Sequence, residues 1–313
     1  MMNSCQIFSA LIAILMAWIY LLIRSEPVRF TKNSQLFQNT YGEWAIVAGA
    51  SEGLGAAWAD ALCEVGVHVV LVARREHALK ELTQQLQNKY KGTNVMVDYW
   101  VQDLADPNLD VLFKTKILNQ YDDNGDGNRL RQYGFLVYNA ASSNIGSVTE
   151  IPLSAHQTTL DVNTRGVIQM THTFSNYLQR HKRTGGMILM SSLSGEVGTA
   201  FVTNYAATKA WNTAYAHGLR HELQPYGIDV LACVAGPITT PNYVNVFGES
   251  RRNEFLEQRP DEVVSECLQS IGVRSSVRTG IIGKLSRFVT VRLLPLETAL
   301  SIFHNELEKM LPP

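Results

Sequence analysis

The sequence has 313 residues, of which 46% are hydrophobic, and its formal net charge is -1. This length and apolar content allow one large buried core, and a single α/β domain of about 250 residues is ordinary. The near-neutral charge argues against an electrostatic surface for nucleic acid. The cysteines at positions 5, 63, 233 and 267 form no C-x-x-C pair, so neither a zinc site nor a disulfide framework is predicted.

An apolar run without charged residues extends from Ile7 to Ile23, which is about 26 Å as a helix and close to the lower limit for crossing a bilayer. Arg24, Arg29 and Lys32 all follow the run. The positive-inside rule therefore predicts a single-pass anchor with the folded domain on the cytoplasmic side of the endoplasmic reticulum or of a bacterial inner membrane. A cleaved signal peptide and a helix lying on the membrane surface are the alternatives.

A glycine-rich loop lies between a predicted buried strand, Trp44 to Ala48, and a predicted helix that ends near Val65. The loop reads Gly49-Ala50-Ser51-Glu52-Gly53-Leu54-Gly55. Glycine permits a tight turn and lets backbone N–H groups at the helix N-terminus approach a phosphate. A strand, this loop and a helix in that order predict a dinucleotide site.

The next predicted strand, Val67 to Val72, ends just before Arg74. In a dinucleotide fold an acidic side chain here bonds the ribose 2′-hydroxyl, whereas arginine pairs with a 2′-phosphate. Arg74 therefore favours NADP(H) over NAD(H), with a solvated surface arginine as the alternative. Glu52 lies near the same phosphate and counts against the assignment.

Helices and strands alternate along the rest of the chain and predict one Rossmann-fold domain of the α/β class, a doubly wound parallel sheet with helices on both faces. The further predicted helices are Glu76 to Tyr90, one from Asp106, Pro152 to Arg180 and Thr203 to Tyr226, and the further predicted strands are Val95 to Val101, Gly134 to Tyr138, Met187 to Ser191 and Ile228 to Val234. Asp103 and the turn Asn139-Ala140 each follow a strand, where Asp103 is placed to accept from an adenine amino group or to cap its turn, and the small residues let backbone approach a cofactor.

Tyr205 and Lys209 lie four residues apart in a predicted helix, so they share one face. The ammonium group, together with an oxidised nicotinamide ring, would favour the phenolate and make the tyrosine a usable acid or base. Ser192 follows a predicted strand and is placed to hold a substrate oxygen. Asn163 inside a helix is either a satisfied polar group or the holder of a water in a proton path. Taken alone, Tyr-x-x-x-Lys also fits a snorkelling surface pair.

These assignments divide the chain into an anchor at 1–24, a polar linker at 25–40, a catalytic domain at 41–280 and a C-terminal extension at 281–313. Pro241 to Val277 lacks strand periodicity, so 236–277 is predicted to be an irregular lid over the substrate, followed by a short last strand at Arg278 to Ile282. The apolar and basic C-terminal extension is expected to pack on the core. Lining a substrate mouth and resting on the membrane are the alternatives.

The segment Asp122 to Gly127 imitates the first half of a calcium loop. Position twelve of that loop is Tyr133, where a bidentate glutamate is needed, and no helical pair flanks the segment. We therefore expect a solvated loop and no bound metal.

A set of motifs over residues 44 to about 240 resembles the short-chain dehydrogenase/reductase family in order and spacing. The motifs are the glycine loop, Asp103, Asn139-Ala140, Asn163, Ser192, Tyr205-x-x-x-Lys209 and Gly236 to Thr240. The apolar N-terminal run, Tyr41 to Trp44 and Ser191 to Gly195 look similar to the membrane-bound 17-beta-hydroxysteroid dehydrogenase and very-long-chain 3-ketoacyl-CoA reductase branch, and related bacterial reductases look equally close.

The resemblance implies a role for each matching position. Tyr205 would be the general acid, Lys209 would bond the nicotinamide ribose and lower the pKa of Tyr205, Ser192 would hold the substrate oxygen and Asn163 would anchor a water. The cofactor would contact Gly49, Ser51, Gly53, Leu54, Gly55, Arg74, Asp103, Leu104, Asn139, Ala140, Tyr205, Lys209, Ile238 and Thr240.

The resulting hypothesis is a membrane-anchored NADP(H)-dependent oxidoreductase that reduces a carbonyl on a lipophilic molecule, such as a 3-oxoacyl thioester or a ketosteroid, or oxidises the corresponding alcohol. The alternative is a non-catalytic, membrane-tethered dinucleotide-binding sensor or assembly factor. The resemblance also implies a homodimer or homotetramer formed through the helices Pro152 to Arg180 and Thr203 to Tyr226.

Overall fold

The computed structural model describes residues 34–119, 131–240, 257–280, 283–284 and 294–308. Seven strands form one sheet in the order β3-β2-β1-β4-β5-β6-β7, and all neighbouring strands are parallel. The strands are β1 Trp44–Ala48, β2 His68–Ala73, β3 Val97–Val101, β4 Tyr133–Tyr138, β5 Gly185–Ser192, β6 Ile228–Ala235 and β7 Ser276–Arg278. The order reverses direction between β1 and β4, and ligands bind at such a switch point, beyond the carboxyl ends of the strands.

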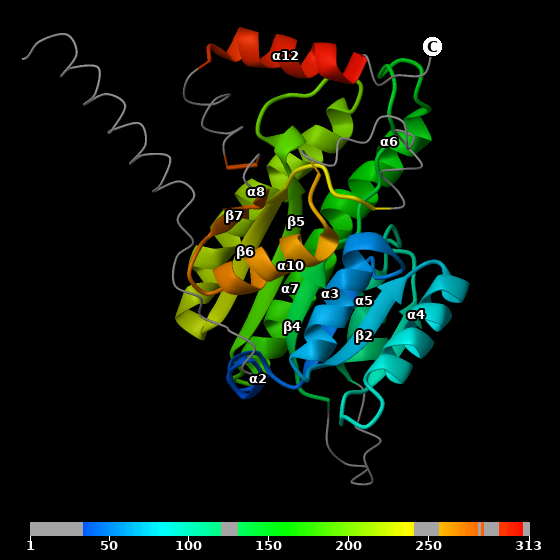
Figure 1. The fold of residues 1–313 in the computed structure, drawn as a ribbon, viewed down its shortest axis with the longest axis vertical. Helices are drawn as coiled ribbons and strands as arrows, with labels where there is room; N and C mark the ends of the chain where they lie inside the picture. The colour runs from blue at the N-terminus through cyan, green and yellow to red at the C-terminus, as the bar shows by residue number, and fades with distance from the viewer. Residues whose placement is uncertain (1–33, 120–130, 241–256, 281–282, 285–293, 309–313) are drawn as a thin grey trace, which may run out of the picture.

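Helices cover both faces of the sheet (Figure 1). They are α2 Ser34–Tyr41, α3 Gly53–Glu64, α4 Glu76–Lys89, α5 Leu109–Phe113, α6 Leu153–Leu160, α7 Gly166–Arg180, α8 Thr203–Leu223, α10 Pro260–Ser270 and α12 Leu296–Glu308. Short π-helical turns follow α5 at Lys114–Leu118 and join α6 to α7 at Asp161–Arg165, and short 3-10 turns lie at Leu193–Gly195 and Gln224–Tyr226.

Side chains of β1 alternate between the two faces, as the strand period of two requires. Ala45 and Val47 belong to one buried cluster, with residues of α2, α3, α4 and α10. Trp44, Ile46 and Ala48 belong to the other, with residues of α5, α7 and α8. Both clusters are buried because helices cover both faces, so the predicted doubly wound α/β domain is confirmed.

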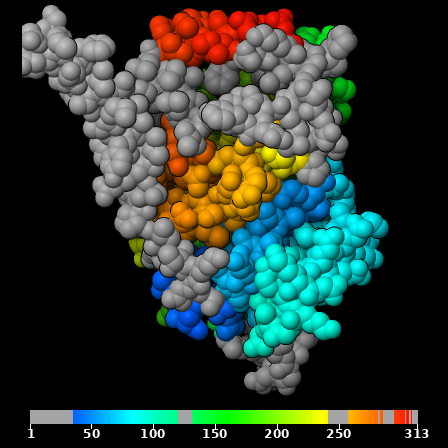
Figure 2. Space-filling model, in the orientation of Figure 1, coloured from blue at the N-terminus to red at the C-terminus, as the bar shows by residue number. Residues whose placement is uncertain are grey.

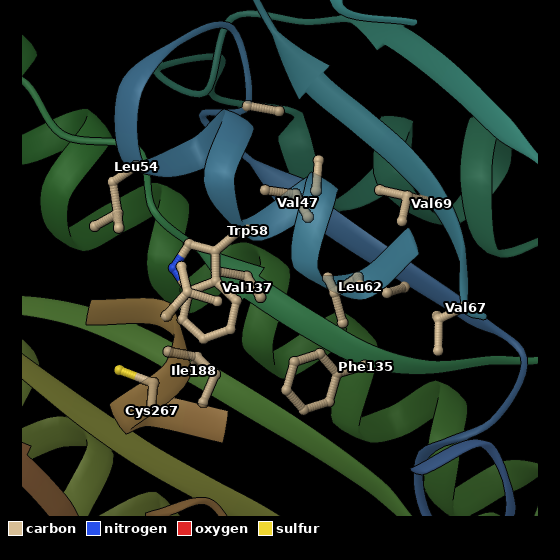
Figure 3. Packing of buried hydrophobic residues seen from close by; sticks show 14 of the residues in the cluster. Val47, Leu54, Trp58, Leu62, Val67, Val69, Phe135, Val137, Ile188 and Cys267 are labelled. Carbon is tan, nitrogen blue, oxygen red and sulfur yellow. The ribbon is translucent and has the colours of Figure 1, made fainter. Parts of the chain in front are cut away.

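Trp58 of α3 anchors the first of these clusters. It is fully buried, and Figure 3 shows its indole beside Val137 of β4 and Ile188 of β5, with Cys267 of α10 close by. The space-filling view shows the same helices forming a continuous surface (Figure 2). This packing fixes the N-terminus of α3, and with it the glycine loop, against the sheet.

The predicted linker at 25–40 is wrong for residues 34–40, because they begin a helix that belongs to the domain. Phe37 and Tyr41, four residues apart on α2, are buried, and the Phe37 ring centroid lies 5.1 Å from that of Phe135 in β4. The Tyr41 hydroxyl donates to Asp229 Oδ2 at 2.9 Å. The contacts that order α2 are with β4 and β6, far along the chain, which is why local composition suggested a linker.

The predicted irregular segment Pro241 to Val277 is also wrong in its second half. Residues 260–270 form α10, whose Val263, Val264 and Cys267 are buried against α3 and the sheet. Arg259 and Glu262 form a capping box at its start. The last strand lies at Ser276–Arg278 rather than at Arg278 to Ile282. Residues 241–256 of the predicted lid lie outside the described residues.

The predicted membrane anchor at 1–24 and the calcium-like segment Asp122 to Gly127 also lie outside the described residues. Among the residues that are described, no helix combines the length and the apolar character needed to span a bilayer. In the same part of the chain, no group of histidine, cysteine, aspartate and glutamate side chains is placed to hold a metal ion.

Candidate active site

The glycine loop folds tightly against the turn that follows β4. Gly49 has φ +82, and a Cβ there would lie 2.5 Å from the backbone nitrogen of Ala140. The side-chain amide of Asn139 donates to the carbonyl oxygen of Gly49 at 2.9 Å, and a Cβ at Gly55 would overlap that same oxygen. Four predicted positions therefore meet at the switch point: Gly49, Gly55, Asn139 and Ala140. Their close approach requires glycine at the first two, because a Cβ there would clash with neighbouring backbone.

The start of α3 suits the pyrophosphate of a dinucleotide. The helix begins at Gly53, which has φ +54, and Leu54 lies in its first turn. The residue before it, Glu52, makes no side-chain hydrogen bond to the first amides of the helix. Backbone N–H groups at a helix N-terminus bind anions, so the residues present fit the phosphates of a nicotinamide dinucleotide.

Arg75, which the sequence analysis did not select, contacts the glycine loop directly. Its guanidinium lies 2.9 Å from Glu52 Oε1 and donates to Ser51 Oγ at 2.9 Å. Arg74 is exposed beside it. The charge of Glu52, which counted against a 2′-phosphate, is therefore balanced by Arg75. The adjacent arginines Arg74 and Arg75 are the feature of the sequence that could have indicated this contact. Successive side chains of an extended segment point to opposite sides, so either arginine is able to face the loop.

Asp103 and Leu104 follow β3 at the same edge of the sheet. Asp103 Oδ1 accepts from the backbone nitrogen of Ala105 at 2.9 Å, so the carboxylate caps its turn. The Leu104 side chain is 6% exposed and packs in the core. The backbone of Leu104, rather than its side chain, is what this position can offer a cofactor.

Ile238 and Thr240 lie in the segment after β6. Ile238 forms an isolated parallel bridge with Gln258, through hydrogen bonds from Thr239 N to Gln258 O at 2.9 Å and from Gln258 N to Pro237 O at 3.0 Å. In a parallel bridge these bonds use the residues on either side of Ile238, so its own N–H and C=O point the other way. Thr240 is partly exposed and ends this described stretch.

Lys209 and Tyr205 occupy the same face of α8, as their spacing predicted. The Lys209 Nζ lies 5.5 Å from the Tyr205 ring centroid and donates to the carbonyl oxygen of Met190 in β5 at 2.8 Å. Lys209 is only 2% exposed. Burial disfavours the charged amine and lowers the pKa of Lys209 to about 8. The surface-pair alternative is therefore wrong.

Tyr205 is held beside Ser192 at the end of β5. Desolvation raises the pKa of the Tyr205 phenol above its ordinary value, and a hydrogen bond with Ser192 opposes this rise. The sequence argument expected a lowered pKa from Lys209 and a nicotinamide ring, but in the chain itself burial has the larger effect. Burial by itself therefore opposes formation of the phenolate.

Ser194 is a second hydroxyl that the sequence analysis missed. Its Oγ donates to Ser192 Oγ at 3.0 Å, and its backbone nitrogen donates to the same oxygen at 3.3 Å. These bonds occupy the acceptor side of Ser192, so its own proton is the one donated in the hydrogen bond with Tyr205. The loop is also tied to the sheet, because Arg278 of β7 donates to Glu196 Oε1 at 2.8 Å.

Asn163 lies in the π-helical turn between α6 and α7 and is fully buried. Its amide nitrogen donates to Ser142 O and to Thr208 Oγ1, both at 2.9 Å, and its oxygen accepts from Ser142 N at 2.8 Å. Both amide protons are thus used to tie the segment after β4 to α8, next to Tyr205. Isolated π turns occur at functional sites. The predicted water-holding role of Asn163 stays a prediction.

A small hollow opens beside Tyr205. Its lining combines apolar side chains, Val148, Ile151 and Phe201, with polar ones such as Asn144 and His156. A pocket of this composition suits an apolar ligand that carries a few polar groups.

A doubly wound sheet with a glycine loop at its switch point is typical of the class of dinucleotide-binding α/β proteins, which bind their ligand in the crevice beyond the carboxyl ends of the strands. Comparison with known families is more specific, because the model of the short chain dehydrogenase family matches residues 43–250. The chain belongs to the short-chain dehydrogenase/reductase family, and is an oxidoreductase that acts on hydroxyl or carbonyl groups.

Similar proteins include a 7beta-hydroxysteroid dehydrogenase of Mediterraneibacter gnavus, 29% identical over 253 residues, which are 79% of this chain and 89% of the relative. A very-long-chain 3-oxoacyl-CoA reductase of Meyerozyma guilliermondii is 25% identical, over 79% of this chain and 69% of its own. Among solved structures, a 7beta-hydroxysteroid dehydrogenase superposes with a TM-score of 0.74 at 23% identity, covering 85% of this chain and 98% of the other. A short-chain dehydrogenase of Sphingobium yanoikuyae in complex with NADPH gives a TM-score of 0.61 at 23% identity, covering 72% of this chain and 82% of the other.

The depressed pKa of Lys209 predicts an unusual dependence of stability on pH. Below pH about 8 the amine is charged in both states, and its burial costs the folded state. Between about 8 and its ordinary 10.5, the folded state releases the proton first, so the unfolded state binds more protons and the free energy of unfolding rises with pH. In urea titrations from pH 7 to 10, the wild type should gain on the order of 2 kcal/mol over Lys209→Met. Lys89→Met, which removes an exposed amine, should keep the gain, and a flat difference between wild type and Lys209→Met would contradict the assignment.

Proposed function

We propose that the chain is an NADP(H)-dependent reductase of a ketone on a lipophilic molecule, a ketosteroid or a 3-oxoacyl thioester, and that it also catalyses the reverse oxidation. The observation that carries this proposal is that Tyr205, at the edge of the hollow, is hydrogen-bonded to Ser192 and lies beside the buried amine of Lys209. A carbonyl oxygen placed at that point lies against two hydroxyl groups, with a buried amine behind them.

The crevice residues have distinct parts in holding the cofactor. The N-terminus of α3, with Gly53 and Leu54, receives the pyrophosphate, and the arginines after β2 receive the 2′-phosphate. Asp103, the backbone of Leu104 and Asn139-Ala140 receive the adenosine, while Ile238 and Thr240 receive the nicotinamide side. When bound, the reduced nicotinamide supplies the hydride that the carbonyl carbon accepts.

Proton transfer is the work of the chain's own residues. Ser192 donates a hydrogen bond to the carbonyl oxygen, and Tyr205 gives its proton to the same oxygen as charge develops there. The Lys209 ammonium stabilises the resulting phenolate. Asn163 positions the start of α8 through Thr208, and the proton returns to Tyr205 through Lys209. In oxidation the same groups act in reverse.

The lipophilic substrate class is supported by the apolar residues of the hollow and by the relatives named for hydroxysteroids and 3-oxoacyl-CoA. The apolar run from Ile7 to Ile23 supports a single-pass anchor that keeps the domain at the cytoplasmic surface of a membrane, where such substrates partition. The exposed side chains of Leu160 and Ile168, 45% and 44% accessible on the helices α6 and α7, support a homodimer or homotetramer.

Tyr205→Phe tests the chemistry apart from binding. Phenylalanine fills the same space but cannot donate a proton, so turnover of a 7-oxosteroid or a 3-oxoacyl thioester should fall by about 10² to 10⁴. NADPH affinity, measured by fluorescence titration, should stay within a few-fold of the wild type. Tyr226→Phe is the matched control, because Tyr226 is 55% exposed at the other end of α8. Full activity in Tyr205→Phe would contradict the assignment.

Arg74→Ala and Arg75→Ala together test the choice of cofactor. A guanidinium bonded to a 2′-phosphate contributes a charge-assisted hydrogen bond, so the double variant should lose about 10- to 100-fold in NADPH affinity and little in NADH affinity. Arg180→Ala, at the end of α7 away from the crevice, is the control. Equal losses for both nucleotides would show that the arginines support the loop rather than select the cofactor.

A further inference from the structure

Phe201 lies in the loop between β5 and α8, four residues before Tyr205, and lines the same hollow as Tyr205. It is one of the apolar side chains in that lining, together with Val148 and Ile151. The position of its ring therefore helps to set how much space is open beside the Tyr205 hydroxyl.

The backbone of Phe201 is held in an unfavourable conformation. Its φ of 61 lies in the left-handed region, which side chains with a Cβ rarely adopt and which persists only where the surroundings fix it. One fixing contact crosses the hollow, because the carbonyl oxygen of Phe201 accepts from the backbone nitrogen of Gly146 at 2.9 Å. This bond joins the loop before α8 to the segment after β4.

The second contact comes from the C-terminal helix α12, which lies across the end of the domain beyond α8 (Figure 1). The imidazole of His304 stacks on the Phe201 ring, with centroids 5.5 Å apart and planes at 19°. Ala299 of the same helix is fully buried, and Leu300 Cδ2 lies 3.8 Å from where a Cβ on Gly198 would be. The helix is thus seated on the loop that carries Phe201.

We infer that Phe201 is a specificity-determining residue whose ring forms a fixed aromatic wall against which the ketone lies beside Tyr205, and that α12 holds the ring in place through His304. This inference rests on the proposed function and extends it, since it gives α12 a positioning role at the substrate site through His304. A flat, fused-ring ketone fits against a fixed aromatic face better than a small one does, because it covers more of the apolar wall.

The test compares two ketones, a 7-oxosteroid and cyclohexanone, by their kcat/KM values in NADPH oxidation. Loss of an aromatic stack releases the Phe201 ring, so His304→Ala should lower the ratio of the 7-oxosteroid value to the cyclohexanone value by about threefold to tenfold. His304→Phe retains a stacking ring and should restore the wild-type ratio. Ile302→Ala, at a 46% exposed position of the same helix, is the matched control. An unchanged ratio in His304→Ala, or an equal change in Ile302→Ala, would overturn the inference.

Amide hydrogen exchange separates this inference from the proposed function. If His304 holds Phe201, the Gly146 N–H, which donates to the Phe201 carbonyl, should exchange at least about threefold faster in His304→Ala and at the wild-type rate in Ile302→Ala. Unchanged exchange would overturn the inference even in an active enzyme. If the wild type reduces no ketone, the proposed function fails, while the exchange rates still decide whether α12 holds Phe201.

Discussion

The burial of one amine, that of Lys209, is the constraint on which the site depends. A charged amine out of water is costly unless it is bonded, and here it is placed between α8 and β5, donating to Met190 O. A second hydrogen bond joins α8 to β5, because Ser191 Oγ donates to the carbonyl oxygen of Lys209 at 2.7 Å. These two bonds fix α8 against β5, so Tyr205, one helical turn from Lys209, lies beside Ser192, where a carbonyl oxygen can reach both. Burying Lys209 lowers the free energy of unfolding but positions the site, a trade-off between stability and function that is common in proteins.

The parts of the molecule that follow local rules could be predicted from sequence. The glycine loop, the alternating strands and helices and the Tyr-x-x-x-Lys spacing each depend on residues close in the chain, so the order of residues alone indicates the α/β domain and the meeting of Tyr205 with Lys209. The ends of strands were also predictable, and these ends bring Gly49 and Asn139 together. Parallel strands placed next to each other at a switch point deliver their following turns to one edge.

The features that were missed depend on partners far along the chain. Helix α2 is ordered by Phe135 and Asp229, and α10 by the surface of α3, so neither segment shows its role in its own composition. Arg75 was passed over for its neighbour because sequence does not say which arginine turns toward Glu52. His304 contacts Phe201 although the two are about a hundred residues apart in the sequence, and such a contact cannot be predicted from hydrophobic periodicity. Burial, which only the tertiary structure reveals, raises the pKa of Tyr205 in the chain by itself.

We propose that the chain passes a hydride from NADPH to a ketone at the point where Ser192 and Tyr205 meet. The most direct measurement uses NADPH that carries deuterium at both C4 positions of the nicotinamide, a 7-oxosteroid and a 3-oxoacyl thioester as acceptors, and mass spectrometry of the alcohols. Deuterium is expected at the carbinol carbon of at least one product, because the hydride is transferred without exchange with water. NADPH that binds the protein, with no deuterium in either alcohol, would contradict hydride transfer at this site.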